Sequence, residues 1–252
     1  MTRALRSANA EFQVLRALAT NRQTRNRENA FIVQGVRNID AARAHGWTVR
    51  AALTPMGASR SAWAEDIVAR VDDHVELAPS LFDELAEREE RPELLLVVEK
   101  GRGVLDRVAL ATVLDRPSSP GNIGTIIRTA DALGGDAVIV VGHGADPYDP
   151  RAIRASTGSF FAVPVVEAPN ADALGELGVT LVATDEHGDT SLDQLPAGPL
   201  ALLFGNETTG LSRALREAAD LTVAIPMAGT ASSLNVAAAH AIVLHAASSR
   251  RG

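Results

Sequence analysis

The stretch that decides the fold is Arg116–Val141, RPSSPGNIGTIIRTADALGGDAVIVV. A loop rich in proline and glycine runs into an amphipathic segment, and an apolar run with three valines and an isoleucine follows. Loops of this kind hold a ligand against a helix N-terminus in many α/β domains. We therefore expect an α/β fold with a mostly parallel sheet, and a ligand site beside residues 116–124.

Two common nucleotide-binding loops do not fit this stretch. A P-loop requires a lysine after its second glycine, and the only lysine of the chain is Lys100. A dinucleotide-binding loop requires three glycines in a fixed pattern, whereas this loop has Gly121 and Gly124, and VGHGADP at 141–147 lacks the third glycine. ATP and NAD are therefore poor candidates.

The same alternation of strands and helices extends over the whole chain. Apolar runs predict strands at 31–35, 49–55, 75–78, 94–99, 109–115, 137–142, 162–167, 180–185, 200–205 and 221–226. Segments with helical spacing lie between them, from 7–20 to 233–249, and the basic segment 21–30 is predicted as a turn. The linker 100–107 contains two glycines, so we predict two domains, residues 1–103 and 104–252.

Charge is distributed unevenly along the chain, whose net charge is −7. Residues 1–50 carry nine arginines and three acidic residues, a balance of +6, whereas the other 202 residues carry 15 basic and 28 acidic residues, a balance of −13. Such asymmetry predicts one surface for a polyanion on an acidic body.

Other chemistry is excluded or given no support by the composition. Cysteine is absent, which removes disulfides, thiolate nucleophiles and cysteine-ligated metals. The six histidines are scattered, so no metal site is expected. The sequence shows neither an apolar run of about 18 residues nor a secretory signal, so we expect no membrane span and a cytoplasmic protein.

Three motifs together resemble the SpoU (TrmH-like) family of RNA ribose 2′-O-methyltransferases, of the SPOUT class. They are DRPSSPGNIGTIIRTADALG at 115–134, LLFGNETTGLS at 202–212 and IPMAGTASSLNVAAA at 225–239. RNRENAFIVQGVRNIDAARAHGW at 25–47 resembles the small L30e-like domain of ribosomal-RNA members. The whole chain is most similar to resistance methyltransferases acting on 23S ribosomal RNA, of the avilamycin and thiostrepton kinds, and the runs at 156–166, 183–189 and 205–212 favour the avilamycin kind.

The resemblance implies a trefoil-knotted C-terminal domain that binds S-adenosylmethionine as a homodimer, preceded by an αβ RNA-binding domain. It implies a catalytic set of Asn122, Arg128, Glu207, Ser233 and Asn235. The cofactor would be bound by Thr184, Gly205, Asn206, Ile225, Met227 and Leu234. Antibiotic resistance is a possible purpose of such a protein.

The chemistry of ribose methylation is consistent with this set. The 2′-hydroxyl is a weak nucleophile, so positioning and proton removal must produce the rate. A guanidinium is hard to deprotonate, so we expect Arg128 to act by its charge. Glu207 could order Arg128 or the incoming nucleotide, while Ser233 and Asn235 could also cap the last helix.

Arginines are the candidates for RNA contacts. The set is Arg22, Arg25, Arg27, Arg37, Arg151 and Arg154, of which the last two could instead bind the cofactor carboxylate. For each of these arginines, the alternative is a place on a solvated basic face that does not bind RNA. Asp185–His187 is interpreted as a solvated loop, and Phe160 and Phe161 as core residues. Two other functions remain open: methylation of transfer RNA, and RNA binding without catalysis.

Overall fold

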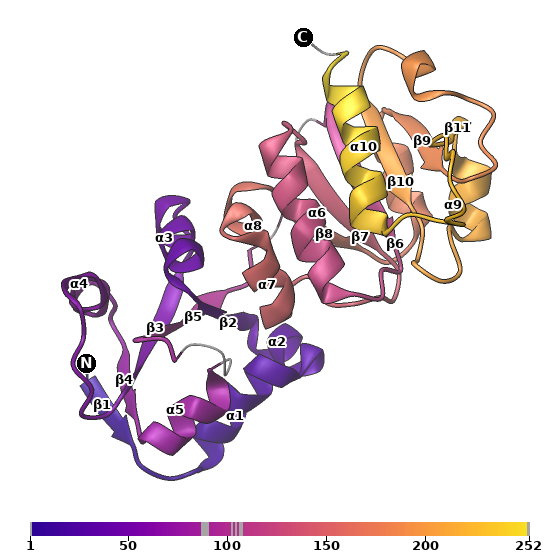
Figure 1. Ribbon diagram of the computed structural model, residues 1–252. Helices are drawn as coiled ribbons and strands as arrows, with labels where there is room; N and C mark the ends of the chain where they lie inside the picture. Colours follow the sequence, from indigo (N-terminus) through magenta and orange to yellow (C-terminus); the bar gives the residue numbers. More distant parts are fainter. Residues whose placement is uncertain (1, 87–90, 102, 104, 106–107, 251–252) are drawn as a thin grey trace. The chain divides into compact units, whose positions relative to one another are not determined.

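The computed structural model describes residues 2–86, 91–101, 103, 105 and 108–250, and it divides into two units (Figure 1). The first unit comprises residues 1–101 with 148–154, and the second comprises 102–147 with 155–252. Part of the predicted linker, at 102, 104 and 106–107, and the end of the helix predicted at 79–88 lie outside the described residues.

The first unit is built on a mixed five-stranded sheet with the order β1-β4-β3-β5-β2. Its strands are β1 (Thr2–Leu5), β2 (Ala30–Gln34), β3 (Val49–Pro55), β4 (His74–Leu77) and β5 (Leu95–Glu99). Its helices are α1 (Ala10–Thr20), α2 (Arg22–Glu28), α3 (Val36–Ala44), α4 (Ala62–Ala69) and α5 (Pro79–Leu85). Helices α1 and α5 bury Phe12, Leu81 and Phe82 against one face of the sheet.

Two elements of this unit differ from the sequence prediction. The segment predicted as a basic turn contains α2, because Asn21 caps its start by accepting a hydrogen bond from Thr24 N (3.1 Å) and Asn29 ends it in the left-handed conformation (φ 49°). Strand β1 was not predicted, because it is short and pairs in parallel with β4, about 70 residues away.

The second unit is a six-stranded sheet in which every pairing is parallel, with the order β11-β9-β10-β6-β7-β8. Its strands are β6 (Leu110–Asp115), β7 (Ala137–Val141), β8 (Val165–Ala168), β9 (Thr180–Thr184), β10 (Leu200–Phe204) and β11 (Leu221–Val223). The parallel α/β architecture predicted from the sequence is therefore confirmed. The trefoil knot stays a prediction.

Helices cover both faces of this sheet. They are α6 (Pro120–Ala132), α8 (Ser159–Ala162), α9 (Arg213–Ala218) and α10 (Val236–Ser248), with 3-10 helices η1 (Ala171–Leu177) and η2 (Leu192–Gln194). Most of helix α7 (Pro150–Ser156) belongs to the first unit. Helices α6 and α10 lie side by side on one face (Figure 1). The opposite face packs against η1 and α9 through Leu174 and Leu215. Phe160 and Phe161 are buried, as predicted.

Local differences from the prediction have local causes. Helix α6 begins five residues before the predicted segment, because Ser119 accepts from Asn122 N (3.3 Å) and Pro120 occupies the first helical position. The first residues of the strand predicted at 162–167 belong instead to α8 and its end, and the helix predicted at 171–178 is a 3-10 helix.

The order of the strands creates a switch point between β6 and β10. From β6 the chain moves outward to β7 and β8, and it later returns to place β10 on the other side of β6. Loops leaving the carboxyl ends of β6 and β10 therefore diverge, and ligands of open parallel sheets bind at such points. This is where the three sequence motifs meet.

Candidate active site

A pocket of about 590 Å³, here called the second-unit pocket, lies at the carboxyl ends of β9, β10 and β11. All six residues predicted to bind the cofactor line it, namely Thr184, Gly205, Asn206, Ile225, Met227 and Leu234. Three of the five predicted catalytic residues, Glu207, Ser233 and Asn235, line it as well. The fold thus brings the second and third motifs together around one cavity.

Glu207 joins the second motif to the first by four hydrogen bonds. Its Oε2 accepts from Ser118 N (2.8 Å) and Ser118 Oγ (2.6 Å). Its Oε1 accepts from Ser119 N (3.2 Å) and Asn122 Nδ2 (2.9 Å). We call these four residues the Glu207 cluster. The cluster fixes the segment that starts α6 against the loop that follows β10.

The ionisation of Glu207 decides what it can do. Burial raises the pKa of the carboxyl, but the hydrogen bonds from Ser118 and Asn122 outweigh burial and lower the pKa to about 2. A carboxylate with so low a pKa is a weak proton acceptor near neutral pH. The hydrogen bonds therefore give Glu207 a positioning role toward Ser118, Ser119 and Asn122.

Asn122 extends the cluster to the third motif. Its Oδ1 accepts from Asn235 Nδ2 (3.2 Å), while Asn235 Oδ1 accepts from Ala237 N (2.8 Å) and so caps α10. The helix cap is therefore Asn235, whereas Ser233 lies two residues before it, exposed at the pocket. One chain of hydrogen bonds, Glu207–Asn122–Asn235, connects all three motifs.

Backbone hydrogen bonds join the two sides of the loop that follows β10. Asn206 and Gly210 exchange two backbone hydrogen bonds (3.1 and 2.9 Å). The Asn206 side chain donates to Arg116 O (2.7 Å) and accepts from Thr208 N (2.9 Å), so its amide shapes the loop. A Cβ on Gly205 would lie 2.2 Å from the Gly210 carbonyl carbon, so only glycine fits there.

Asp115 and Arg116 form a clamp that the sequence did not reveal. Asp115 is buried at the end of β6 and accepts from Ser212 N and from Arg116 Nε (2.9 Å). Arg116 also donates to Gly210 O (3.2 Å). The clamp holds residues 210 to 212, at the end of the loop, to β6. The only sequence signal was an Asp-Arg pair immediately after a buried strand.

The hydroxyl of Thr184 finds no hydrogen-bond partner among the described residues. Its Oγ1 is buried at the end of β9, and the described residues give it no hydrogen bond, although Thr184 lines the second-unit pocket. A buried hydroxyl without a partner is destabilising. A ligand with one polar atom at this point would satisfy it, so the pocket fits a bound nucleoside better than an apolar ligand.

Arg128 does not lie at the second-unit pocket of its own chain. It is exposed on α6, it does not line the pocket, and the described residues offer its guanidinium no hydrogen bond. The alternative that Glu207 orders Arg128 is wrong, because both Glu207 oxygens are bonded to residues 118–122.

The predicted RNA-binding arginines occupy different environments. Arg25 is only 2% exposed and donates to Leu18 O (2.8 Å), so its assignment to an RNA phosphate is wrong. Its position on the inner side of α2 could not be read from a segment taken as a turn. Arg27 and Arg37 are exposed, and Arg27 pairs with Glu28 (2.8 Å). Arg22 is half-buried.

Arg151 and Arg154 are both exposed on α7, three residues apart. Arg151 pairs with Asp149 (2.9 Å), and Arg154 lines a pocket of the first unit. Neither lines the second-unit pocket, so contact with the cofactor carboxylate receives no support.

Other site predictions can be placed more briefly. Asp185–His187 forms a polar turn, of which Asp185 and Glu186 also line the second-unit pocket. Within the described residues, no group of three or more His, Asp or Glu side chains could hold a metal ion. In the same part of the chain, no helix has the length and apolar character needed to cross a bilayer.

Comparison with known proteins gives consistent matches for both units. Residues 109–245 match the SpoU rRNA Methylase family, and residues 9–96 match the SpoU L30e-like domain. The chain is 45% identical, over 99% of its length and 93% of the relative, to the 23S rRNA (uridine(2479)-2′-O)-methyltransferase of Streptomyces viridochromogenes. It is 29% identical, over 89% of its length and 90% of the relative, to the 23S rRNA (guanosine(2553)-2′-O)-methyltransferase RlmP of Bacillus subtilis.

A solved structure agrees with these matches. The SpoU methyltransferase AviRb from Streptomyces viridochromogenes, crystallised with AdoMet, superposes with a TM-score of 0.89 at 45% identity, covering 96% of this chain and 97% of that one. Sequence, architecture and the joined motifs lead to one conclusion: this chain belongs to the SpoU rRNA methylase family.

Proposed function

We propose that this protein transfers the methyl group of S-adenosylmethionine to a ribose 2′-hydroxyl of 23S ribosomal RNA. The observation that carries the proposal is the hydrogen-bond chain Glu207–Asn122–Asn235, which joins the three family motifs beside the second-unit pocket. The two relatives that match over both units act on 23S rRNA at a 2′-oxygen.

The second-unit pocket suits S-adenosylmethionine. Its volume of about 590 Å³ lies in the range of cofactor sites. Ile225, Met227 and Leu234 supply an apolar lining, and Thr184 supplies a buried hydroxyl to which the described residues give no hydrogen bond. When bound, the cofactor supplies a methyl group on a positively charged sulfur. The glycine at 205 lets the loop backbone close over the pocket floor.

The chain's own residues would position the nucleophile and stabilise its charge. Asn122 and Asn235 present amide groups held in place by Glu207, so little reorganisation is needed when the ribose enters. As the 2′-oxygen bonds to carbon, the carbon–sulfur bond breaks and the hydroxyl proton leaves. Arg128 would stabilise the charge that develops on the oxygen. The proton acceptor is a group other than Glu207, whose pKa is about 2.

Ribosomal RNA is favoured over transfer RNA by the first unit. This unit matches the SpoU L30e-like domain, and its first 50 residues carry the basic excess of the chain. An RNA-binding protein without catalysis would not need the Glu207 cluster or the second-unit pocket. We infer that the protein works in the cytoplasm, where ribosomes are assembled. A role in antibiotic resistance stays a prediction.

A homodimer is the proposed assembly. On α10, Ala238, Ile242 and His245 form an exposed face, and Ile242 is 41% exposed. Val243 and Ala247 on the same helix are buried inside their own chain, so they cannot face a partner. We therefore propose the Ile242 face for the partner. Light scattering of the wild type and Ile242→Glu tests this: the wild type should be a dimer and the variant a monomer.

The proposed function is tested by methyl transfer from labelled S-adenosylmethionine to 23S rRNA, 16S rRNA and bulk transfer RNA. We expect label in 23S rRNA alone, recovered as a 2′-O-methylnucleoside after digestion. The matched control is Asn122→Asp, which keeps the size of the side chain but replaces the amide donor to Glu207 by a carboxylate. Label in transfer RNA, or in a methylated base, would contradict the proposal.

A further inference from the structure

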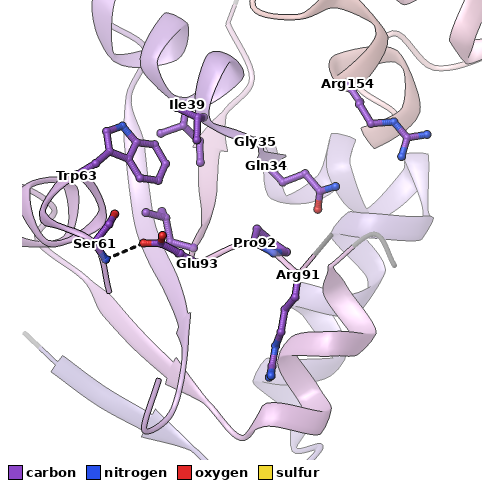
Figure 2. Close-up of a pocket in the computed structure, with 11 residues that line it drawn as sticks. Gln34, Gly35, Ile39, Ser61, Trp63, Arg91, Pro92, Glu93 and Arg154 are labelled. Atoms are coloured by element: carbon purple, nitrogen blue, oxygen red, sulfur yellow. Dashed lines mark hydrogen bonds between the residues drawn. The ribbon is translucent and has the colours of Figure 1, made fainter. Parts of the chain in front are cut away.

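A second cavity, of about 560 Å³, lies within the first unit, and we call it the first-unit pocket. It is formed where β2 ends and α3 begins, with the start of α4 and residues 91–94 on its other sides (Figure 2). Of the residues considered above, only Arg154 lines it, and Arg154 does not line the second-unit pocket. Its size is in the range for small ligands and nucleotides.

One wall of this pocket is a fixed aromatic ring. Trp63 is half-buried, and its Nε1 donates to Asp40 Oδ1 (2.8 Å), which ties the indole on α4 to helix α3. Ile39 beside it is fully buried, whereas Val36 at the start of α3 is 55% exposed. A rigid indole with aliphatic neighbours offers a surface on which a planar heteroaromatic ring can stack.

The same pocket contains a fixed hydrogen-bond acceptor. Glu93 Oε2 accepts from Ser61 N (2.8 Å), as Figure 2 shows, and this bond lowers the pKa of the carboxyl. The side chain of Glu93 is exposed, so its carboxylate can also accept a hydrogen bond from a ligand. A carboxylate accepts from N–H donors. Guanine, adenine and cytosine carry an exocyclic amine, whereas the N3–H of uracil lies between two carbonyl oxygens that repel a carboxylate.

Positive charge lies at the rim of the pocket. Arg154 lines it, and the exposed Arg37 follows the lining residue Val36 in the sequence. Arg91 contributes only its stem, because its guanidinium pairs with Asp83 (2.8 Å). A polyanion could therefore enter at the side of Arg37 and Arg154, while its base reached the apolar interior. This combination of charge and stacking surface is that of single-stranded nucleic-acid sites.

We propose that the first-unit pocket binds one unpaired base of the RNA substrate, stacked on Trp63 and hydrogen-bonded through its exocyclic amine to Glu93. The proposal rests on the proposed function, since it takes RNA as the ligand. It deepens that function by giving the first unit a means to read sequence. Unpaired bases in loops are the features of RNA that proteins read most directly.

The test uses the indole itself as the reporter. The chain has two tryptophans, so Trp47→Phe in the full-length protein leaves Trp63 as the only one. This variant is titrated with RNA heptamers UUUXUUU in which X is G, A, C, U or an abasic site. We expect Trp63 fluorescence to be quenched, and the heptamers with G, A or C to bind roughly tenfold more tightly than those with U or the abasic site, as one good hydrogen-bond pair provides.

Variants separate stacking, hydrogen bonding and charge. Labelled heptamers measured by anisotropy should bind about five- to a hundredfold more weakly to Trp63→Leu, with most affinity restored in Trp63→Phe. Glu93→Gln should remove most of the discrimination against U. Arg37→Ala should lower the slope of log K against log salt by about 0.7, whereas Trp63→Leu should leave that slope unchanged. In methyl transfer to 23S rRNA, Trp63→Leu should raise KM and leave kcat unchanged.

Equal affinity for all five heptamers, together with unchanged binding by Trp63→Leu and Glu93→Gln, would overturn the proposal. The heptamer series and Glu93→Gln decide the matter if Trp63→Leu does not fold. Failure of the proposed function has a different signature. In that case 23S rRNA would accept no methyl group from the wild-type protein, while base-dependent quenching of Trp63 persisted.

Discussion

Replacing Glu207 by glutamine tests whether the carboxylate holds the active site together. Each carboxylate oxygen accepts two hydrogen bonds, so Oε1 and Oε2 together satisfy four donors of residues 118–122. The glutamine amide keeps one oxygen but presents its NH2 group to the other two donors. Two hydrogen bonds are lost, and Asn122 loses its orientation.

The expected magnitude follows from the ionisation of Glu207. Lowering its pKa from 4.5 to about 2 corresponds to an upper limit of about 3 kcal/mol. The carboxylate is exposed, so solvent screening reduces this to ~1–2 kcal/mol. Because the folded-state pKa is the lower one, the stabilisation is complete above pH 4.5 and is lost as the pH falls toward 2.

Chemical denaturation of the wild type and Glu207→Gln should therefore show the full difference at pH 7 and a smaller one at pH 3. Turnover at pH 7 should fall, because the Asn122 and Asn235 amides are no longer held. The control is Glu217→Gln, which removes only a surface pair with Arg213 (2.7 Å) and should change little. An ionisation of Glu207 near neutral pH in the kcat profile would refute the reasoning, since it would make Glu207 the base.

Three other changes probe separate parts of the second unit. Gly205→Ala places a Cβ 2.2 Å from the carbonyl carbon of Gly210 and should abolish S-adenosylmethionine binding in calorimetry. In the control Gly175→Ala the new Cβ meets no neighbour within 4 Å, so binding should persist; equal affinities of the two variants would contradict this prediction. Arg128→Ala should lower kcat about a hundredfold and leave the affinity for the cofactor unchanged. Normal turnover would show that the Arg128 side chain contributes only to RNA binding. Burial lowers the pKa of His240 to about 3, so the free energy of unfolding should fall as the pH drops below 6.5. Between pH 6.5 and about 5, where Glu207 contributes no slope, an unchanged slope in His240→Leu would contradict this.

Much of the fold could be predicted because its signals are local. Apolar runs between amphipathic segments identified β6, β7, β9 and β10, and a row of such runs separated by helices requires a parallel sheet. The end of α3 near Gly46 was also predictable, because glycine readily adopts the left-handed conformation that ends many helices, and Gly46 does so here (φ 71°). Strand β1 was missed because its only support is a distant partner strand.

The site residues were predictable as a set, but their connections were not. The motifs marked Glu207, Asn122 and Asn235, and the structure places them in one hydrogen-bond chain. Sequence reasoning could not assign Glu207 its partners, because they lie about 85 residues away. Arg25 was misassigned for a related reason: which side of α2 faces the core depends on packing that a seven-residue helix does not reveal.

The proposed function is tested most directly by identifying the atom that accepts the methyl group. After the methylated nucleotide of 23S rRNA has been mapped, an RNA fragment carrying a single 2′-deoxy substitution at that nucleotide is offered with labelled S-adenosylmethionine. The account predicts that this fragment binds as tightly as the unsubstituted RNA and accepts no methyl group. Methylation of the 2′-deoxy fragment at the mapped nucleotide would contradict the account, because the methyl group would then be carried by a base.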